Sequence, residues 1–121
     1  MPTSSPDLDL LQGTLDVMIL KALSWRAMHG FGVAKWIRRT TDDVLQIEDS
    51  ALYPALHRMA QKKLVAAEWD VTESGRRARY YELTAVGREA LNAQTTAWND
   101  YVGAVQQIIT ASSRKPARSR A

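Results

Sequence analysis

The apolar residues change their spacing near residue 65, and this change constrains the fold more than any other feature of the chain. Before Val65 they recur every three or four residues, as on one face of a helix. From Ala67 to Leu83 they alternate with polar residues on either side of the turn-forming stretch TESGR (72–76), a pattern typical of a β-hairpin. Helical spacing returns from Ala85 onward. The sequence therefore predicts a mainly α fold with a small β-hairpin.

Three helical segments are predicted before the hairpin. They span residues 14–28, 33–40 and 49–65, and the glycine-containing stretch HGFG separates the first two. Helix, helix, helix, hairpin is the order of a winged helix-turn-helix, whose second motif helix enters the DNA major groove and whose hairpin, the wing, meets the neighbouring backbone or minor groove. We therefore expect a flexible segment at 1–9, a winged helix-turn-helix DNA-binding domain at 10–84, a long C-terminal dimerisation helix at 85–111 and a basic disordered tail at 112–121.

The third segment carries its apolar side chains on one narrow face. Leu52, Leu56 and Met59 fall within an arc of about 100°, and mostly polar residues occupy the opposite side. Taken alone, that side is either an ordinary solvated surface or a surface that touches a ligand. The arginine-rich hairpin that follows favours the second alternative, with this side lying in DNA.

The start of the third segment suits contact with an anion. Asp49 or Ser50 is expected to cap the helix, with Pro54 near the first turn, where its missing N–H costs little. The N–H groups at this end of the helix would then lie close to phosphate.

The predicted wing concentrates positive charge. Its tip and returning strand hold three arginines, with Glu73 the only acidic residue between Asp70 and Glu82. Arginine suits phosphate because its planar guanidinium offers several donors in a fixed geometry. The residues expected to face DNA are Lys35, Ser50, Ala51, Tyr53, Pro54, His57, Arg58, Gln61, Arg76, Arg77 and Arg79.

The overall charge does not by itself indicate nucleic acid as a partner. The formal net charge is +3 at pH 7, but Arg114, Lys115, Arg118 and Arg120 lie in the tail and leave residues 1–113 at −1. Such a tail either adds nonspecific attraction to DNA or only keeps the protein soluble. The case for DNA binding therefore rests on where charges cluster in the folded part.

No pattern in the chain favours an enzyme. The chain has no cysteine and two histidines, His29 and His57, which lack the spacing of zinc ligands. The stretch Gly30-Phe31-Gly32 follows a helix instead of a strand, so it is no phosphate-binding loop. His29 is expected to pack or to cap a helix. We expect no catalytic residue, no metal and no cofactor.

The sequence also predicts a cytoplasmic protein without a membrane segment. The N-terminus MPTSSPDLDLLQG lacks the basic start and apolar stretch of a secretion signal. Charges interrupt every apolar run before it reaches the roughly 18 residues that a membrane span needs.

Five motifs occur in an order that resembles a known family: GTLD at 13–16, HGFG at 29–32, LYPALHR at 52–58, RARYY at 77–81 and LTAVG at 83–87. They are similar to the successive signatures of PadR-type transcriptional regulators, and the similarity covers roughly residues 8–110. The length resembles that of short members with a single C-terminal helix. The resemblance implies a bacterial, homodimeric repressor that binds DNA. A homodimer is expected to bind a palindromic operator, with half-sites about one helical turn apart.

One position departs from the family pattern. The family usually has glycine where this chain has Lys63, at the end of the third helical segment. A left-handed residue at a helix C-terminus would cost lysine on the order of 1 kcal/mol relative to glycine.

The last helix is predicted to hold the dimer. Two apolar series recur every seven residues, which is the spacing of helices that pack lengthwise, but they are too short for an autonomous coiled coil. We expect this helix to lie across a dimer mate; the alternative is that it folds back on its own domain. The expected interface residues are Val17, Leu20, Leu91, Trp98, Tyr101, Val105 and Ile108.

Trp98 has two interpretations. It is either an ordinary core residue, since tryptophan buries a large apolar area, or part of a pocket at the dimer axis. In the second interpretation Gln94, Trp98 and Tyr101 bind a small aromatic or amphiphilic effector that releases DNA, as the resemblance to short PadR-like repressors implies.

A winged helix can also serve only to bind another protein, because a fold does not fix a function. The cluster of Arg76, Arg77 and Arg79 discriminates between the two functions, since a protein-binding wing has no need to remain basic.

Overall fold

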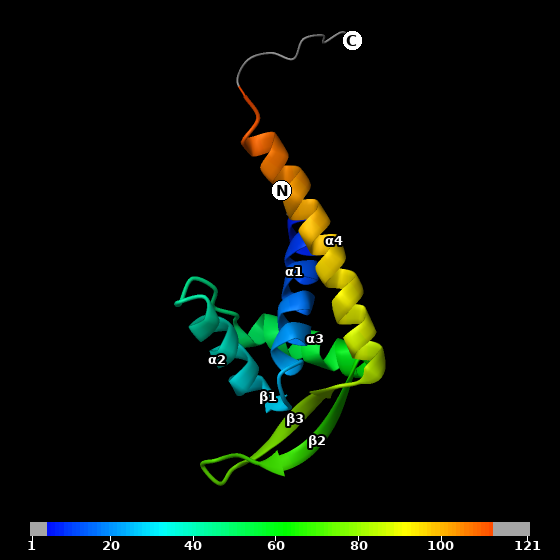
Figure 1. Cartoon of the computed structure of the whole chain (residues 1–121). Coiled ribbons are helices and arrows are strands. Elements are labelled where there is room, and N and C mark those ends of the chain that lie inside the picture. The colour runs from blue at the N-terminus through cyan, green and yellow to red at the C-terminus, as the bar shows by residue number, and fades with distance from the viewer. Residues whose placement is uncertain (1–4, 113–121) are drawn as a thin grey trace.

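The structure, a computed structural model, describes residues 5–112, with side chains from residue 13 onward. In chain order it contains α1 (Ser5–Leu23), β1 (Met28–His29), α2 (Gly30–Thr40), α3 (Asp49–Gln61), β2 (Val65–Val71), β3 (Arg77–Leu83) and α4 (Ala85–Ile109). The first three helices gather above the β2–β3 hairpin, and α4 runs along α1 away from that hairpin (Figure 1). The predicted mainly α winged helix-turn-helix with a long C-terminal helix is confirmed.

α1 differs from its prediction at both ends. It begins at Ser5, so residues 5–9 are helical where a flexible segment was expected. The helix ends at Leu23 instead of residue 28. Residues 1–4 and the predicted tail from residue 113 lie outside the described part of the chain.

The sheet contains a third strand that the sequence did not predict. The strand order is β1-β3-β2, all antiparallel, with Met28 opposite Tyr81 and Val65 opposite Leu83. β1 has only two residues, too few to show an alternating pattern. Its pairing ties the connection between α1 and α2 to the wing. Gly30-Phe31-Gly32 therefore follows a short strand, which corrects the expectation that it follows a helix.

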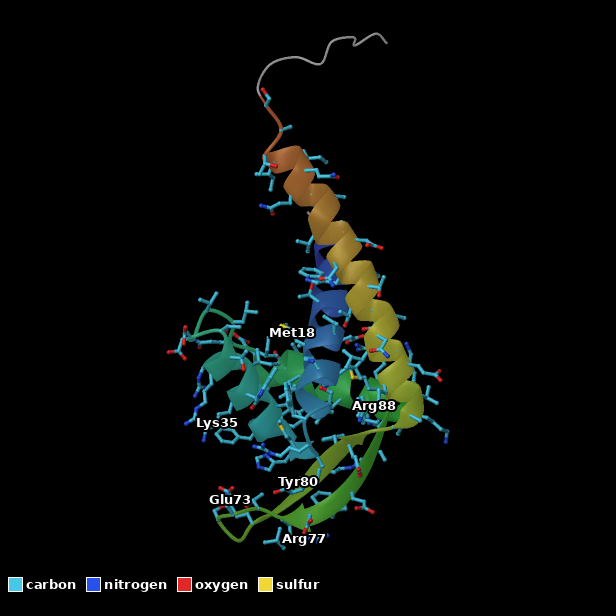
Figure 2. All side chains as sticks on the ribbon, viewed as in Figure 1. Met18, Lys35, Glu73, Arg77, Tyr80 and Arg88 are labelled. Atoms are coloured by element: carbon cyan, nitrogen blue, oxygen red, sulfur yellow. The ribbon has the colours of Figure 1, made fainter. Side chains whose placement is uncertain are left out.

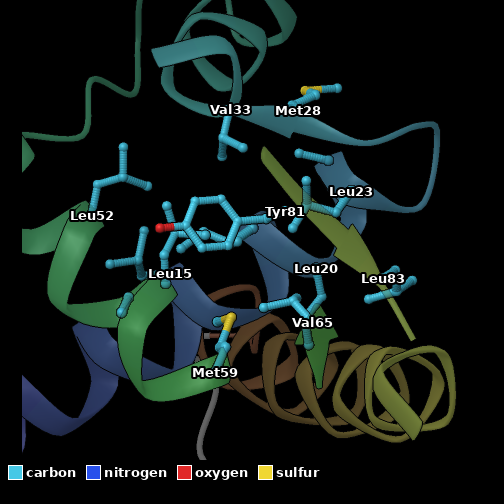
Figure 3. Close-up of a cluster of buried hydrophobic side chains, with 14 of the residues drawn as sticks. Leu15, Leu20, Leu23, Met28, Val33, Leu52, Met59, Val65, Tyr81 and Leu83 are labelled. Atoms are coloured by element: carbon cyan, nitrogen blue, oxygen red, sulfur yellow. The ribbon is translucent and has the colours of Figure 1, made fainter. Parts of the chain in front are cut away.

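The core lies between α1, α2, α3 and the base of the hairpin. Tyr81 of β3 projects into the middle of this cluster, near Leu15, Val33 and Leu52 (Figure 3). Each fully buried aliphatic side chain stabilises the fold by roughly 1.5–3 kcal/mol relative to an exposed one. Leu91 of α4 belongs to the same cluster, so the long helix is anchored to its own domain.

α4 starts at a close contact with the end of α3. The Thr84 hydroxyl accepts a 2.9 Å hydrogen bond from the Gly87 N–H, as expected for a helix cap. A Cβ at Gly87 would overlap the Leu64 carbonyl oxygen, so glycine permits this approach. Within residues 5–112, no helix combines the length and the apolarity that a membrane span requires.

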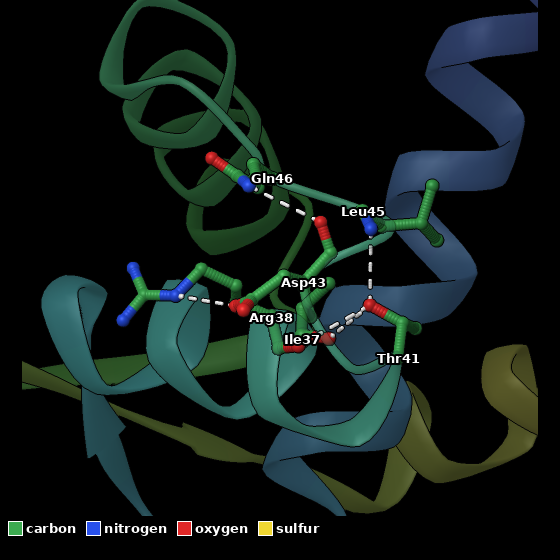
Figure 4. A network of polar contacts seen from close by, with 6 residues as sticks. All are labelled: Ile37, Arg38, Thr41, Asp43, Leu45 and Gln46. Carbon is green, nitrogen blue, oxygen red and sulfur yellow. Dashed lines mark hydrogen bonds and ion pairs between the residues drawn. The ribbon is translucent and has the colours of Figure 1, made fainter.

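The connection between α2 and α3 is held by its own polar contacts (Figure 4). The Thr41 hydroxyl accepts from the Leu45 N–H at 3.0 Å, and Arg38 Nε lies 3.4 Å from Asp43 Oδ1. Asp42 and Asp43 have positive φ angles of 51° and 69°, which end α2 without a glycine.

Candidate nucleic-acid interface

α3 presents the exposed side that the sequence predicted. Leu52, Ala55, Leu56 and Met59 are buried against the rest of the domain. The predicted residues that remain exposed on this helix are Ser50, Ala51, Tyr53, Pro54, His57 and Gln61.

The start of α3 differs in detail from its prediction. Its N-cap is Glu48, whose side chain makes no capping hydrogen bond, and Asp49 and Ser50 already belong to the first turn. Pro54 lies in the second turn instead of the first. Because proline has no N–H, the Ser50 carbonyl loses its usual helical donor.

Tyr53 connects the exposed side of α3 to the start of α2. A Cβ on Gly30 would lie 2.5 Å from Tyr53 Cε1, so the ring rests directly on this glycine. The tyrosine is nevertheless 44% exposed. Burial raises the pKa of the Tyr53 phenol, and the Asp49 carboxylate and Tyr81 raise it further. Its hydroxyl is therefore a neutral hydrogen-bond donor at neutral pH.

Arg58, one of the residues predicted to face DNA, is only partly exposed and forms an ion pair with α1. Its Nη2 lies 2.6 Å from Asp16 Oδ1 on α1, and the two side chains are 31% and 23% exposed. Burial raises the pKa of the Asp16 carboxyl more than the Arg58 and Lys62 charges lower it. Helical spacing places Arg58 at the edge of the polar side, but only the tertiary fold brings Asp16 to it.

Two of the wing arginines, Arg77 and Arg79, lie on the face that continues the buried side of the sheet. Trp69 lies opposite Arg79, and Val71 lies opposite Arg77, so these side chains share a face with Tyr81. The Arg77 guanidinium lies 5.0 Å from the centre of the Trp69 ring. Stacking on an aromatic ring restricts the arginine while leaving its donors available.

The other face of the wing is acidic. Glu68, Asp70 and Glu82 alternate with the residues of the basic face and are exposed. The wing therefore has one face that attracts a polyanion and one that repels it.

A groove of about 1300 Å³ lies between the wing and the start of α2. Figure 2 shows Lys35 projecting from α2, Arg77 on the wing below it and Glu73 at the wing tip. Tyr53 of α3 also lines the groove. Its six cationic lining residues are Arg26, Lys35, Arg39, Arg76, Arg77 and Arg79, against the single acidic residue Glu73. The structure thus brings the predicted lysine and all three wing arginines to one place.

Two cations of the groove were not predicted from the sequence. Arg39 follows Lys35 by one helical turn, so their spacing could have identified it as part of the same surface. Arg26 lies in the turn between α1 and β1, where no periodic pattern indicates the direction of a side chain.

His29 has a structural role in the groove wall. Its Nδ1 accepts a 3.0 Å hydrogen bond from the Gly32 N–H and so caps α2. Its ring meets Tyr80 edge-on, with 5.1 Å between centroids. The expectation that His29 packs or caps a helix is confirmed. Among the side chains that the structure describes, from residue 13 to 112, no group of three potential metal ligands comes together.

A second cavity, of about 290 Å³, lies between α1 and α4. The Trp98 and Tyr101 rings, 6.4 Å apart, form part of its wall. Among the described residues, Gln94 Oε1 is a buried oxygen without a hydrogen-bond partner. The complete lining is Gly13, Thr14, Asp16, Val17, Gln94, Ala97, Trp98 and Tyr101. The three predicted effector residues therefore meet at one cavity.

The predicted dimer residues divide into two groups. Leu20 and Leu91 are buried in the core of their own protomer, because α4 folds back along α1 of the same chain. They are therefore not available to a partner, which corrects their assignment to the dimer interface. Tyr101 and Ile108 remain 52% and 76% exposed. The other predicted residues, Val17, Trp98 and Val105, are partly exposed.

Comparisons with known proteins relate this architecture to one family. Residues 19–93 match the profile of the transcriptional regulator PadR-like family. The chain is 29% identical over 102 residues to the uncharacterized protein X of Lysinibacillus sphaericus, covering 84% of this chain and 89% of that protein.

Solved structures agree with this match. The fold is similar to that of a transcriptional regulator from Clostridium thermocellum, with a TM-score of 0.76 and 24% identity, covering 84% of this chain and 99% of the other. It is also similar to a PadR family transcriptional regulator from Eggerthella lenta, with a TM-score of 0.71 and 28% identity, covering 87% of this chain and 89% of the other.

Proposed function

Because the chain belongs to the PadR-like family of transcriptional regulators, we propose that it binds double-stranded DNA through α3 and the wing. The observation that carries the proposal is the groove in which six cations face one acidic residue, beside the exposed side of α3. Membership in a family of transcriptional regulators also supports the expectation that the protein is not an enzyme.

α3 enters the major groove in this proposal. His57 and Gln61 are exposed and offer hydrogen-bonding groups to base edges, which carry sequence information. Lys35, Arg39 and the wing arginines contact phosphates, which fix the register without reading sequence. The acidic outer face of the wing permits only one orientation of the wing on the duplex.

The protein acts as a homodimeric repressor in the cytoplasm, with residues 10–84 binding DNA and residues 85–111 holding the dimer. The exposed apolar residues Tyr101 and Ile108, with the partly exposed Val105, favour a second copy of α4 as the cover. A two-fold axis there would present two copies of α3 to a palindromic operator, with half-sites about one helical turn apart.

Selecting bound fragments from random duplexes tests DNA recognition. We expect a palindromic consensus, and we expect Gln61→Ala to change it because a base contact is lost. Glu68→Gln, on the acidic face of the wing, is the matched control and should leave the consensus unchanged. If the folded wild-type protein enriches no duplex sequence, the alternative is favoured that this winged helix only binds another protein.

The α1–α4 cavity is proposed as the site of a small aromatic or amphiphilic effector. Its aromatic wall offers stacking, and Gln94 Oε1 offers an unused acceptor. An effector releases DNA only if it prefers the state that does not bind DNA. Titrating planar aromatic compounds while following tryptophan fluorescence tests this: quenching should disappear in Trp98→Ala and persist in Trp25→Phe, because Trp25 lies outside the cavity.

A further inference from the structure

The Asp16–Arg58 ion pair joins the α1–α4 cavity to α3. Asp16 lines the cavity, and its Oδ1 accepts a 2.6 Å hydrogen bond from Arg58 Nη2. Arg58 directly follows His57, whose side chain is exposed on the side proposed to meet DNA. One carboxylate therefore contacts both the cavity and the proposed recognition helix.

This contact is directional, unlike the apolar packing on the buried side of α3. The buried side chains of the helix, Leu52, Ala55, Leu56 and Met59, are apolar, and apolar contacts tolerate small rotations. A hydrogen bond weakens steeply when its distance or angle departs from the ideal. The pair is also partly buried, so separating the two charges leaves each of them with fewer favourable contacts. The ion pair therefore resists rotation of α3 about its axis.

We propose that Asp16 is a positioning residue for DNA recognition, which holds α3 through Arg58 at the rotation suited to the major groove. We further propose that a guest in the α1–α4 cavity displaces Asp16 and so releases α3. This second step rests on the proposed function of the cavity, whereas the first needs only that the protein binds DNA.

Two roles of Arg58 predict opposite results for operator binding. If Arg58 contacts phosphate, Arg58→Gln lowers the slope of log affinity against log salt by about 0.9, and Asp16→Asn strengthens binding by freeing the guanidinium. If Arg58 holds α3 in place, each substitution weakens operator binding about tenfold, with little change in the slope. The double variant then binds no more weakly than either single variant, because both remove the same interaction.

Two further variants control for folding and for charge. The exchanged pair, Asp16→Arg with Arg58→Asp, should recover most of the operator affinity if the contact itself matters. Arg38→Gln with Asp43→Asn removes an exposed ion pair next to α3 and should change affinity less than twofold. A thermal transition shows whether each single variant folds. If one does not fold, the exchanged pair is the test. An exchanged pair that folds but binds operator no better than a tenth as tightly as wild type overturns the positioning role.

The release step is tested with N-phenyl-1-naphthylamine, a neutral aromatic probe with no charge to compete for Asp16. In wild type we expect operator DNA to weaken probe binding about tenfold, and the probe to weaken operator binding by the same factor. The probe and the operator should both still bind to Asp16→Asn, but each should change the affinity for the other by a factor near one. A factor that persists in Asp16→Asn, or a wild-type protein in which probe and operator are indifferent to each other, overturns the release step. Failure of the wild type to bind any duplex would refute the proposed function instead.

Discussion

Asp16 makes the stability of the fold depend on pH. Because burial raises the pKa of its carboxyl despite the neighbouring charges of Arg58 and Lys62, the folded protein holds this proton more tightly than the unfolded chain does. Below the ordinary pKa of 3.8, both states are protonated and the contribution to the free energy of unfolding is fully present. The contribution is lost as the pH rises through the raised pKa of the folded state.

We expect the free energy of unfolding of wild type to fall relative to that of Asp16→Asn as the pH rises from about 3.5 toward neutral. The Asn variant has no carboxyl to titrate, so it lacks this dependence. Urea titrations of both proteins across this range provide the measurement, with Asp43→Asn as the control at an exposed ion pair. A difference that stays constant with pH would mean that Asp16 has the same pKa in both states.

At the level of single residues, helical and strand spacing predicted which side chains are buried and which are exposed. These predictions failed where contacts between distant segments determine how a side chain lies. Helical spacing correctly predicted that His57 and Gln61 are exposed and that Leu52 is buried. The same spacing could not show that Arg58 turns toward α1, because its partner lies 42 residues away in the chain.

The end of α3 provides a test at the level of an element. Lys63 has a φ of 64°, and the Leu64 N–H donates to the Met59 carbonyl at 2.9 Å, so the helix closes with a left-handed residue that is not glycine. We expect Lys63→Gly to raise the free energy of unfolding by about 0.5–1 kcal/mol, since the relief of strain exceeds the entropy that glycine adds to the unfolded chain. Chemical denaturation measures this change. Gly75→Ala should instead lower the free energy of unfolding, because Gly75 has a φ of 87°.

The wing gives a second test at this scale. Replacing Arg76, Arg77 and Arg79 with alanine should weaken binding to all duplexes alike and reduce the salt slope by roughly 0.9 for each lost phosphate contact. Affinity measured at several salt concentrations provides the slope. Glu68→Gln with Asp70→Asn, on the opposite face, should not reduce it. An unchanged slope in a folded triple variant would exclude the wing from the interface.

Helices and strands whose apolar residues recur at a regular spacing were predicted, and those without such a spacing were not. The hairpin and α4 follow directly from their spacing, and Thr84 identified the start of α4. β1 was missed because Met28 and His29 form a strand only through their pairing with β3. The early start of α1 at Ser5 was missed because its first residues are polar and include proline.

At the scale of the whole molecule, the exposed apolar residues of α4 predict a dimer. Tyr101→Glu with Ile108→Glu should shift the protein toward monomer at micromolar concentration, because both charges would be buried against a second copy. Sedimentation velocity measures the shift. Val86→Glu is the matched control, since Val86 is exposed on the same helix but lies outside this group of residues. Equal sedimentation of all variants and wild type would contradict this interface.

At this scale, hydrophobicity alone could not show which surface each apolar residue packs against. The sequence indicated that Leu20 and Leu91 are buried, but it could not tell the core of the same protomer from the surface of a partner. The same limit applies to Trp98, whose position beside a cavity depends on how α4 lies along α1.

The pairing of β1 with β3 also joins two segments that are made at different times during synthesis. α1 and α2 leave the ribosome long before Tyr81, the residue that lies opposite Met28 and fills the middle of the core. Leu91 completes the same cluster later still. We therefore expect the nascent N-terminal helices to keep apolar surface uncovered until most of the chain has been made, and the domain to fold in one late cooperative event.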